Sequence, residues 1–102
     1  MKKIVINRCF GGFGLSQEAL IELQKRNDKF VYLLDDGILH LNTEDVERDN
    51  PNLVEVVEKL GSLRASSDYA KLKIVEIPDD VDYTIAEYDG IEWVAEAHRT
   101  WS

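Results

Sequence analysis

The sequence predicts an α+β fold, a small mixed or antiparallel sheet with two helices packed on one face. Three observations lead to it: an apolar run near the start, two segments with helical periodicity, and two Asp-Gly pairs that each lie between β-prone runs. The predicted order of elements is roughly β-α-β-β-α-β-β-β. Residues 1–102 contain no repeat, low-complexity segment or linker, so we expect a single domain.

The first half of the chain predicts a strand, a helix and a hairpin. Residues 2–7 are apolar at three successive positions, which is typical of a strand buried on both faces. We expect this segment to be a strand and not a signal peptide. Residues 16–26 form a helix that Ser16 caps, with Glu18 near its positive end. Residues 29–42 form a hairpin in which Asp36-Gly37 provides a type I′ turn, with φ > 0 at both central residues.

The second half predicts another helix and three strands. Asn50-Pro51 begins a helix whose apolar face runs to Leu60, and Gly61 is placed to end it. Residues 62–71 fit a loop or a short helical turn. Residues 72–78 are a strand ended by proline, and residues 83–97 repeat the hairpin pattern around Asp89-Gly90.

Composition limits the classes of function. Twenty acidic against twelve basic residues give a net charge of −8, which works against a broad nucleic-acid footprint. The single cysteine, Cys9, excludes an internal disulfide and a multi-cysteine zinc site and fits a cytoplasmic protein. No apolar run approaches the roughly 18 residues of a membrane helix.

A glycine-rich segment between the first strand and the first helix is the first candidate site. A helix N-terminus offers free N–H groups to an anion, and glycines allow close approach of the backbone. The predicted ligand-binding residues are Arg8, Gly11, Gly12, Phe13, Gly14 and Ser16. Their spacing fits neither nucleotide-loop fingerprint, so the favoured alternative is a tight turn with Phe10 and Phe13 filling the core.

The C-terminal residues are the second candidate. His98, Arg99 and Trp101 combine a titratable ring, a fixed cation and a stacking surface, which suits a nucleobase, a phosphate or a protein interface. The alternative is a last strand with Trp101 packed on the domain. A terminal element can also be exchanged between copies, so we expect a homo-oligomer.

An acidic segment is the third candidate. Eight acids lie between Lys73 and Arg99 with no intervening base: Glu76, Asp79, Asp80, Asp82, Glu87, Asp89, Glu92 and Glu96. Such a surface can imitate nucleic-acid phosphates and occupy a basic groove. The alternative is a solubilising face with ordinary turn residues. The twelve-residue spacing of a calcium loop is absent, and no metal or other cofactor is predicted.

Catalysis has the least support. His40 or His98 could activate Cys9, but a lone cysteine at a strand end is more often a small buried hydrophobe. His40 alternates with apolar neighbours and fits the outward position of a hairpin strand. We therefore expect a protein that is not an enzyme.

Three stretches, KIVINRCFGGFGLS, LKIVEIPDDV and EYDGIEWVAEAHRTW, resemble small proteins of tailed phages and prophages that are mostly uncharacterised. The resemblance covers nearly the whole chain and is least distinctive over residues 17–49. It brings no assigned activity and no catalytic residues. It implies a context, because small acidic phage proteins without evident enzymology are often antagonists of bacterial defence.

Within that context the first hypothesis is a sponge in the host cytoplasm. It would sequester a nucleotide immune signal at the glycine segment with Arg8, and Trp101 would stack on a base. The second is an acidic inhibitor of a nucleic-acid-guided nuclease, of the anti-CRISPR type, in which residues 76–96 imitate nucleic acid. The third is a phage accessory protein that acts through its interactions with other proteins.

Overall fold

The computed structural model describes residues 2–26, 29–42, 46–95 and 100–101. It confirms the α+β class and the predicted order of elements, with a short further strand after them. The elements are β1 (Lys2–Asn7), α1 (Gln17–Lys25), β2 (Val31–Leu33), β3 (Leu39–Leu41), α2 (Pro51–Ala65), β4 (Leu72–Ile77), β5 (Thr84–Tyr88), β6 (Ile91–Ala95) and β7 (Thr100–Trp101).

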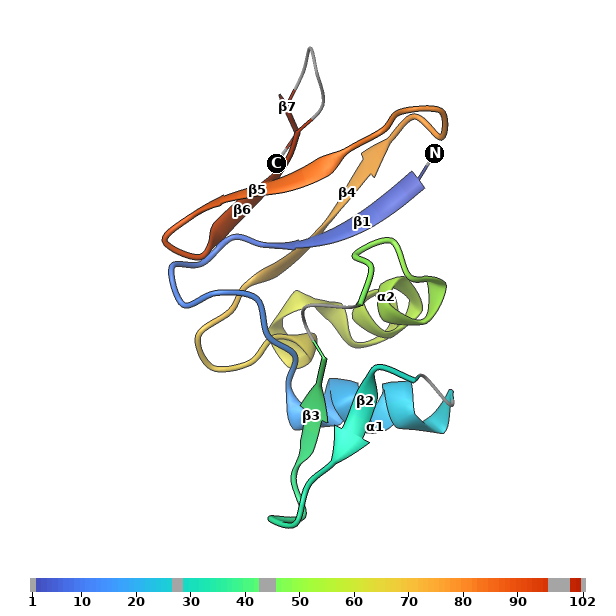
Figure 1. Ribbon diagram of the computed structural model, residues 1–102, viewed down its shortest axis with the longest axis vertical. Coiled ribbons are helices and arrows are strands. Elements are labelled where there is room, and N and C mark those ends of the chain that lie inside the picture. Colours follow the sequence, from blue (N-terminus) through green and yellow to red (C-terminus); the bar gives the residue numbers. More distant parts are fainter. Residues whose placement is uncertain (1, 27–28, 43–45, 96–99, 102) are drawn as a thin grey trace.

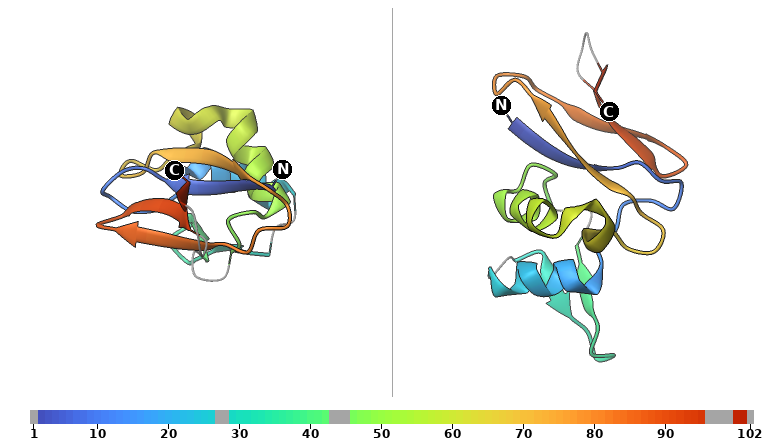
Figure 2. Two further views of the ribbon diagram at one scale, coloured as in Figure 1. Left: turned by 90° about the horizontal axis from the view of Figure 1, so that it is seen from above. Right: turned by 180° about the vertical axis from the view of Figure 1, so that it is seen from behind.

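The elements stack in tiers along an elongated molecule of 44 × 26 × 22 Å (Figure 1). The strands form three small antiparallel sheets, β1-β4, β2-β3 and β5-β6-β7. The β2-β3 hairpin and α1 make one end of the stack, and α2 packs on α1. The β1-β4 pair lies on the other side of α2, and the β5-β6-β7 sheet forms the opposite end (Figure 2).

Strand β1 lies between these layers, which explains its continuous apolar run. Val5 joins the cluster formed with the two helices, whereas Ile4 and Ile6 join a second cluster with β4 and β6. All three side chains are fully buried. The prediction of a strand buried on both faces is therefore confirmed.

Both helices begin where the sequence predicts. The Ser16 hydroxyl accepts a hydrogen bond from the Ala19 amide at 3.1 Å, and the Asn50 side chain caps α2 in the same way. Gly61 has φ +81° and interrupts the helical backbone, but a further helical turn follows and continues to Ala65. Gly61 thus ends the first segment of α2. Of residues 62–71, residues 62–65 form a short helical turn and residues 66–71 form a loop.

The two Asp-Gly pairs adopt different turns. Asp89 and Gly90 have φ values of +50° and +94°, as a two-residue type I′ turn requires. At the first pair only Gly37 has positive φ, and five residues connect the strands, so the predicted type I′ turn is wrong there. The reason is local, because the Asp36 carboxylate accepts a hydrogen bond from the Ile38 amide and Gly37 closes a wider turn onto the Leu34 carbonyl.

Candidate functional site

The glycine segment is a junction where three loops meet. A side chain at Gly11 would overlap the backbone of Tyr69, and one at Gly14 would lie 2.5 Å from the Ser67 hydroxyl. A Cβ at Gly90 would lie 2.5 Å from the Phe10 carbonyl oxygen. These glycines therefore allow residues 8–15, residues 66–71 and the turn at residues 88–91 to pack backbone against backbone. We call this region the loop junction.

Arg8 and Ser16 take part in separate hydrogen-bond networks at the two ends of the glycine segment. The Arg8 guanidinium donates to the Glu92 carbonyl at 2.8 Å, which directs it toward β6. The Ser16 hydroxyl caps α1 and donates to the Arg64 carbonyl at 2.6 Å. Arg64 in turn pairs with Glu18 in the first turn of α1. The two predicted anion-binding groups thus both have partners within the chain.

The two phenylalanines of the glycine segment differ in environment. Phe13 is partly buried, and the Arg48 guanidinium lies over its ring at 3.7 Å from the centroid. Phe10 is 69% exposed, so the prediction that it fills the core is wrong. Its backbone carbonyl lies close to Gly90, while the side chain is exposed to solvent.

A buried polar centre lies beneath the loop junction, and sequence reasoning missed it. Arg48 donates two hydrogen bonds to the Glu92 carboxylate, at 2.5 and 2.8 Å. The backbone N–H of Asn7 donates a third hydrogen bond to the same carboxylate at 2.8 Å. The Asn7 side chain donates to the carbonyls of Cys9 and Gly90 and accepts from the Lys71 amide. Asn7 therefore joins all three loops of the junction from inside.

Glu92 must be removed from the predicted acidic surface, because it is only 6% exposed. It lies two residues before Val94, whose side chain is in the core, so both face inward from β6. This alternation was the available signal, but only the fold shows which of the two faces is inward. Glu96 lies outside the described residues.

The remaining six acids of that segment are exposed on β4, β5 and the turns beside them: Glu76, Asp79, Asp80, Asp82, Glu87 and Asp89. We call them the acidic tier. Residues 74–95 contain no lysine or arginine, but Lys3 of the paired strand β1 lies opposite Glu76 and interacts with its charge. The Glu87 carboxylate also accepts a hydrogen bond from the Gly90 amide, which supports the turn-chemistry interpretation for this residue.

Exposed aromatic side chains surround the loop junction. Phe10, Tyr69 and Tyr88 are 69%, 75% and 69% exposed, and each belongs to one of its three loops. We call them the aromatic rim. Large exposed rings on neighbouring segments are unusual on a solvated surface and are typical of protein interfaces.

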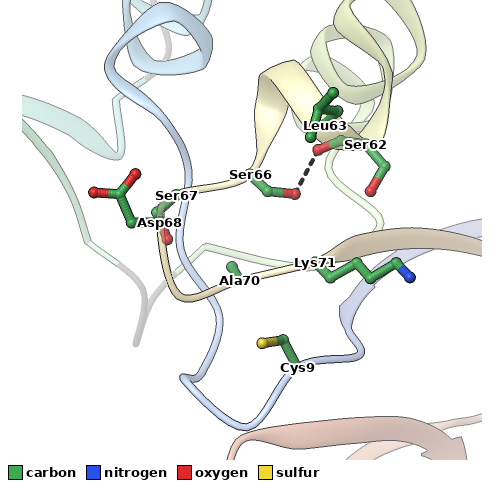
Figure 3. Close-up of a pocket in the computed structure, with 8 residues that line it drawn as sticks. All are labelled: Cys9, Ser62, Leu63, Ser66, Ser67, Asp68, Ala70 and Lys71. Carbon is green, nitrogen blue, oxygen red and sulfur yellow. Dashed lines mark hydrogen bonds between the residues drawn. The ribbon is translucent and has the colours of Figure 1, made fainter.

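A cavity of about 510 Å³ opens beside the aromatic rim, between the last turn of α2 and the loops of the junction (Figure 3). Its lining residues are Cys9, Ser62, Leu63, Ser66, Ser67, Asp68, Ala70 and Lys71. No histidine of the described residues lines it. His40 instead stacks on Tyr32 in the β2-β3 hairpin, with 5.7 Å between ring centroids.

The predicted C-terminal site is described only in part. His98 and Arg99 lie outside the described residues. Trp101 belongs to β7, whose backbone pairs with β6 opposite Val94. The role of these three residues in ligand binding or oligomer formation stays a prediction.

The described residues contain no group of three or more potential metal-ligating side chains. Within the same ranges, no helix has the length and apolar character needed to cross a membrane. Comparison with protein-family models, with curated proteins and with solved structures finds no match to this chain.

Proposed function

We propose that this chain is a non-catalytic binding protein that recognises a positively charged surface of another protein. The observation that carries the proposal is the acidic tier, a set of exposed carboxylates that extends from the end of β4 along β5 to the exposed rings of the aromatic rim. Glu76, Asp79, Asp80 and Asp82 lie where β4 ends and β5 begins, and β5 leads from there to Glu87, Asp89 and the loop junction (Figure 1).

The two features have complementary effects on binding. A surface of one charge sign attracts a partner of the opposite sign and accelerates association, most strongly at low ionic strength. Aromatic side chains then contribute most of the binding energy once water is excluded from them. A second copy of this chain would be repelled by the same acids, so a basic partner fits this end better.

This proposal corresponds to the second and third hypotheses from the sequence. The basic groove of a nucleic-acid-guided nuclease is one surface of the proposed class, and phage origin with an anti-defence role is part of the same proposal. The nucleotide-sponge hypothesis ranks below it, because an anion would have to compete with the Glu92 carbonyl for Arg8. It would also meet Glu18 and Asp68 near the start of α1.

The test compares charge removal on the acidic tier with equal removal elsewhere. A partner captured by the purified chain is identified and expressed separately, and its Kd is measured between 50 and 500 mM salt. The triple variant Asp80→Asn, Asp82→Asn, Asp89→Asn is expected to weaken binding about tenfold at low salt and to flatten the salt dependence. The control, Glu18→Gln, Glu55→Gln, Glu58→Gln, removes the same charge from the helices.

Equal loss of affinity in both triple variants would contradict the proposal, as would a partner that binds through an acidic surface. The sponge hypothesis is tested separately, by measuring the Tm of the protein with each member of a panel of nucleotides. A rise in Tm with a cyclic oligonucleotide that disappears in Arg8→Ala would favour sequestration over protein recognition.

A further inference from the structure

We propose that the cavity beside the aromatic rim receives one uncharged, apolar side chain of the basic partner. This inference rests on the proposed function and assigns the anchoring point of that interaction. The cavity lies between residues 62–71 and Cys9, and its lining residues share the loops that carry Phe10 and Tyr69 (Figure 3).

Of the three serines in the wall, Ser62 and Ser66 have hydroxyl groups that form hydrogen bonds within the protein. Ser66 donates to the Ser62 carbonyl at 2.5 Å and accepts from the Leu72 amide at 2.9 Å. The Ser62 hydroxyl donates to the Leu72 carbonyl at 2.6 Å. A polar ligand would therefore gain little from these serines while losing its own hydration, which favours an apolar occupant.

The rest of the wall is apolar in its middle and charged at its two sides. Cys9 and Ala70 lie between Asp68 and Lys71, whose side chains extend in opposite directions (Figure 3). Leu63 stands at the edge and is 93% exposed, on the turn that follows the bend at Gly61. An apolar side chain in the cavity would cover this leucine and remove it from water.

The surroundings favour a side chain of a protein over a free small molecule. Tyr69 lies between Asp68 and Ala70 in the chain, and Phe10 follows Cys9, so the exposed rings continue directly from the cavity wall. A buried anchor encircled by aromatic contacts is the usual arrangement of an interface hot spot. Glu87 and Asp89 of the acidic tier flank Tyr88, and Asp68 belongs to the cavity wall, so a basic segment around the anchor is favoured.

The cavity can be tested without the partner by disulfide exchange at Cys9, the only cysteine of the chain. The probes are mixed disulfides that carry an isobutyl, a phenethyl, a 2-aminoethyl or a 2-carboxyethyl group. Each competes with 2-mercaptoethanol, and intact-protein mass spectrometry measures occupancy. We expect about tenfold higher occupancy for the two apolar probes than for the charged ones.

Two variants test whether the cavity causes this preference. Ala70→Leu fills the opening, and Leu63→Gln makes its edge polar at a position exposed enough to leave folding intact. Both are expected to reduce the apolar preference to less than about threefold. The matched control, Leu34→Gln on the β2-β3 hairpin, is expected to keep it. Equal occupancy by all four probes, or a preference for the carboxyethyl probe through Lys71, would overturn the inference.

A second measurement uses the complex. Saturating partner should slow the reaction of Cys9 with N-ethylmaleimide at least about tenfold, and unchanged labelling at saturation would show that no side chain enters the cavity. The probe experiment does not depend on the partner, and the salt titration does not depend on Cys9. Failure of the cavity inference is therefore distinguishable from failure of the proposed function.

Discussion

Arg48 and Glu92 form an ion pair in which both side chains are largely removed from water. The favourable geometry offsets the cost of burying two charges, because the guanidinium uses both terminal nitrogens and the carboxylate has a further donor in the Asn7 amide. The pair connects the loop before α2 to β6. It therefore supports the loop junction from beneath without being part of its exposed surface.

Substitution Arg48→Met would leave the Glu92 carboxylate buried without its cation. We expect a loss of about 3–5 kcal/mol in the free energy of unfolding, measured by urea denaturation. The control is Lys59→Met, which breaks an exposed pair with Glu22 and should cost less than about 1 kcal/mol. Similar losses in both variants would show that the buried ion pair contributes no more to stability than the exposed one.

Substitution of two glycines with positive φ distinguishes the cost of backbone strain from the cost of steric overlap. Gly37 has open space around it, so Gly37→Ala should cost only the left-handed conformation, about 1 kcal/mol. Gly90→Ala adds overlap with the Phe10 carbonyl and the Gly12 amide, for a total of about 3 kcal/mol. Chemical denaturation of both variants measures the difference in the free energy of unfolding. Equal losses would mean that the backbone of the loop junction shifts to accommodate the added methyl group at little cost.

At the scale of elements, α1 and α2 are joined by a charged contact as well as by their apolar faces. The Glu22 carboxylate lies 3.0 Å from Lys59 on α2 and 3.2 Å from Arg26, the C-cap residue of α1. Hydrogen bonds from Lys59 and Arg26 lower the pKa of Glu22 from 4.5 to about 2. The folded state therefore holds this group charged over a range where the unfolded chain binds a proton.

The sign of the pH dependence follows from that lowered pKa. The contribution of Glu22 to stability is fully present above pH 4.5 and is lost as the pH falls from 4.5 toward 2. In Glu22→Gln, the free energy of unfolding should fall less steeply across this range. In Lys59→Met, NMR titration should show a higher pKa for Glu22, and an unchanged pKa would assign the effect to Arg26 alone.

Elements with local signals could be predicted from the sequence, and those that depend on distant partners could not. Ser16 and Asn50 cap helices through neighbours two or three residues away, and Asp89-Gly90 closes a turn within four residues. Glu92, by contrast, is buried because Arg48 meets it from 44 residues away, and no local pattern distinguishes it from the exposed acids around it.

The same limit applies to the candidate site. The sequence marks the glycines, Arg8 and the acidic segment as unusual, and the structure places the glycines at a packed junction and six of the acids on the surface of β4, β5 and the adjacent turns. The cavity and the aromatic rim depend on residues 62–71 approaching residues 8–11. That approach brings together segments more than 50 positions apart in the sequence, which periodicity and spacing within one segment do not encode.

The whole molecule is a stack whose middle and ends differ in protection from solvent. Strand β1 has neighbours on both faces and pairs with β4, whereas the β2-β3 hairpin consists of two three-residue strands at one end of the stack (Figure 1). Several large apolar side chains of that hairpin are exposed, among them Tyr32, Leu33, Leu34 and Ile38. A short two-stranded hairpin has little stability of its own and depends on the element that covers it, here α1.

Hydrogen exchange should follow this order of tiers. We expect the amides of β1 and β4 to exchange only through global unfolding, because opening them requires separation of α2 from one face and of β6 from the other. The amides of β2 and β3 should exchange faster by at least about two orders of magnitude through local opening, which leaves the other tiers folded. Exchange measured by NMR as a function of denaturant distinguishes the two regimes, since only global opening has the full dependence on denaturant concentration. Equal protection in the hairpin and in β1 would contradict the tiered description. It would mean that the stack unfolds as one unit from end to end, with α1 and the hairpin held as firmly as the centre.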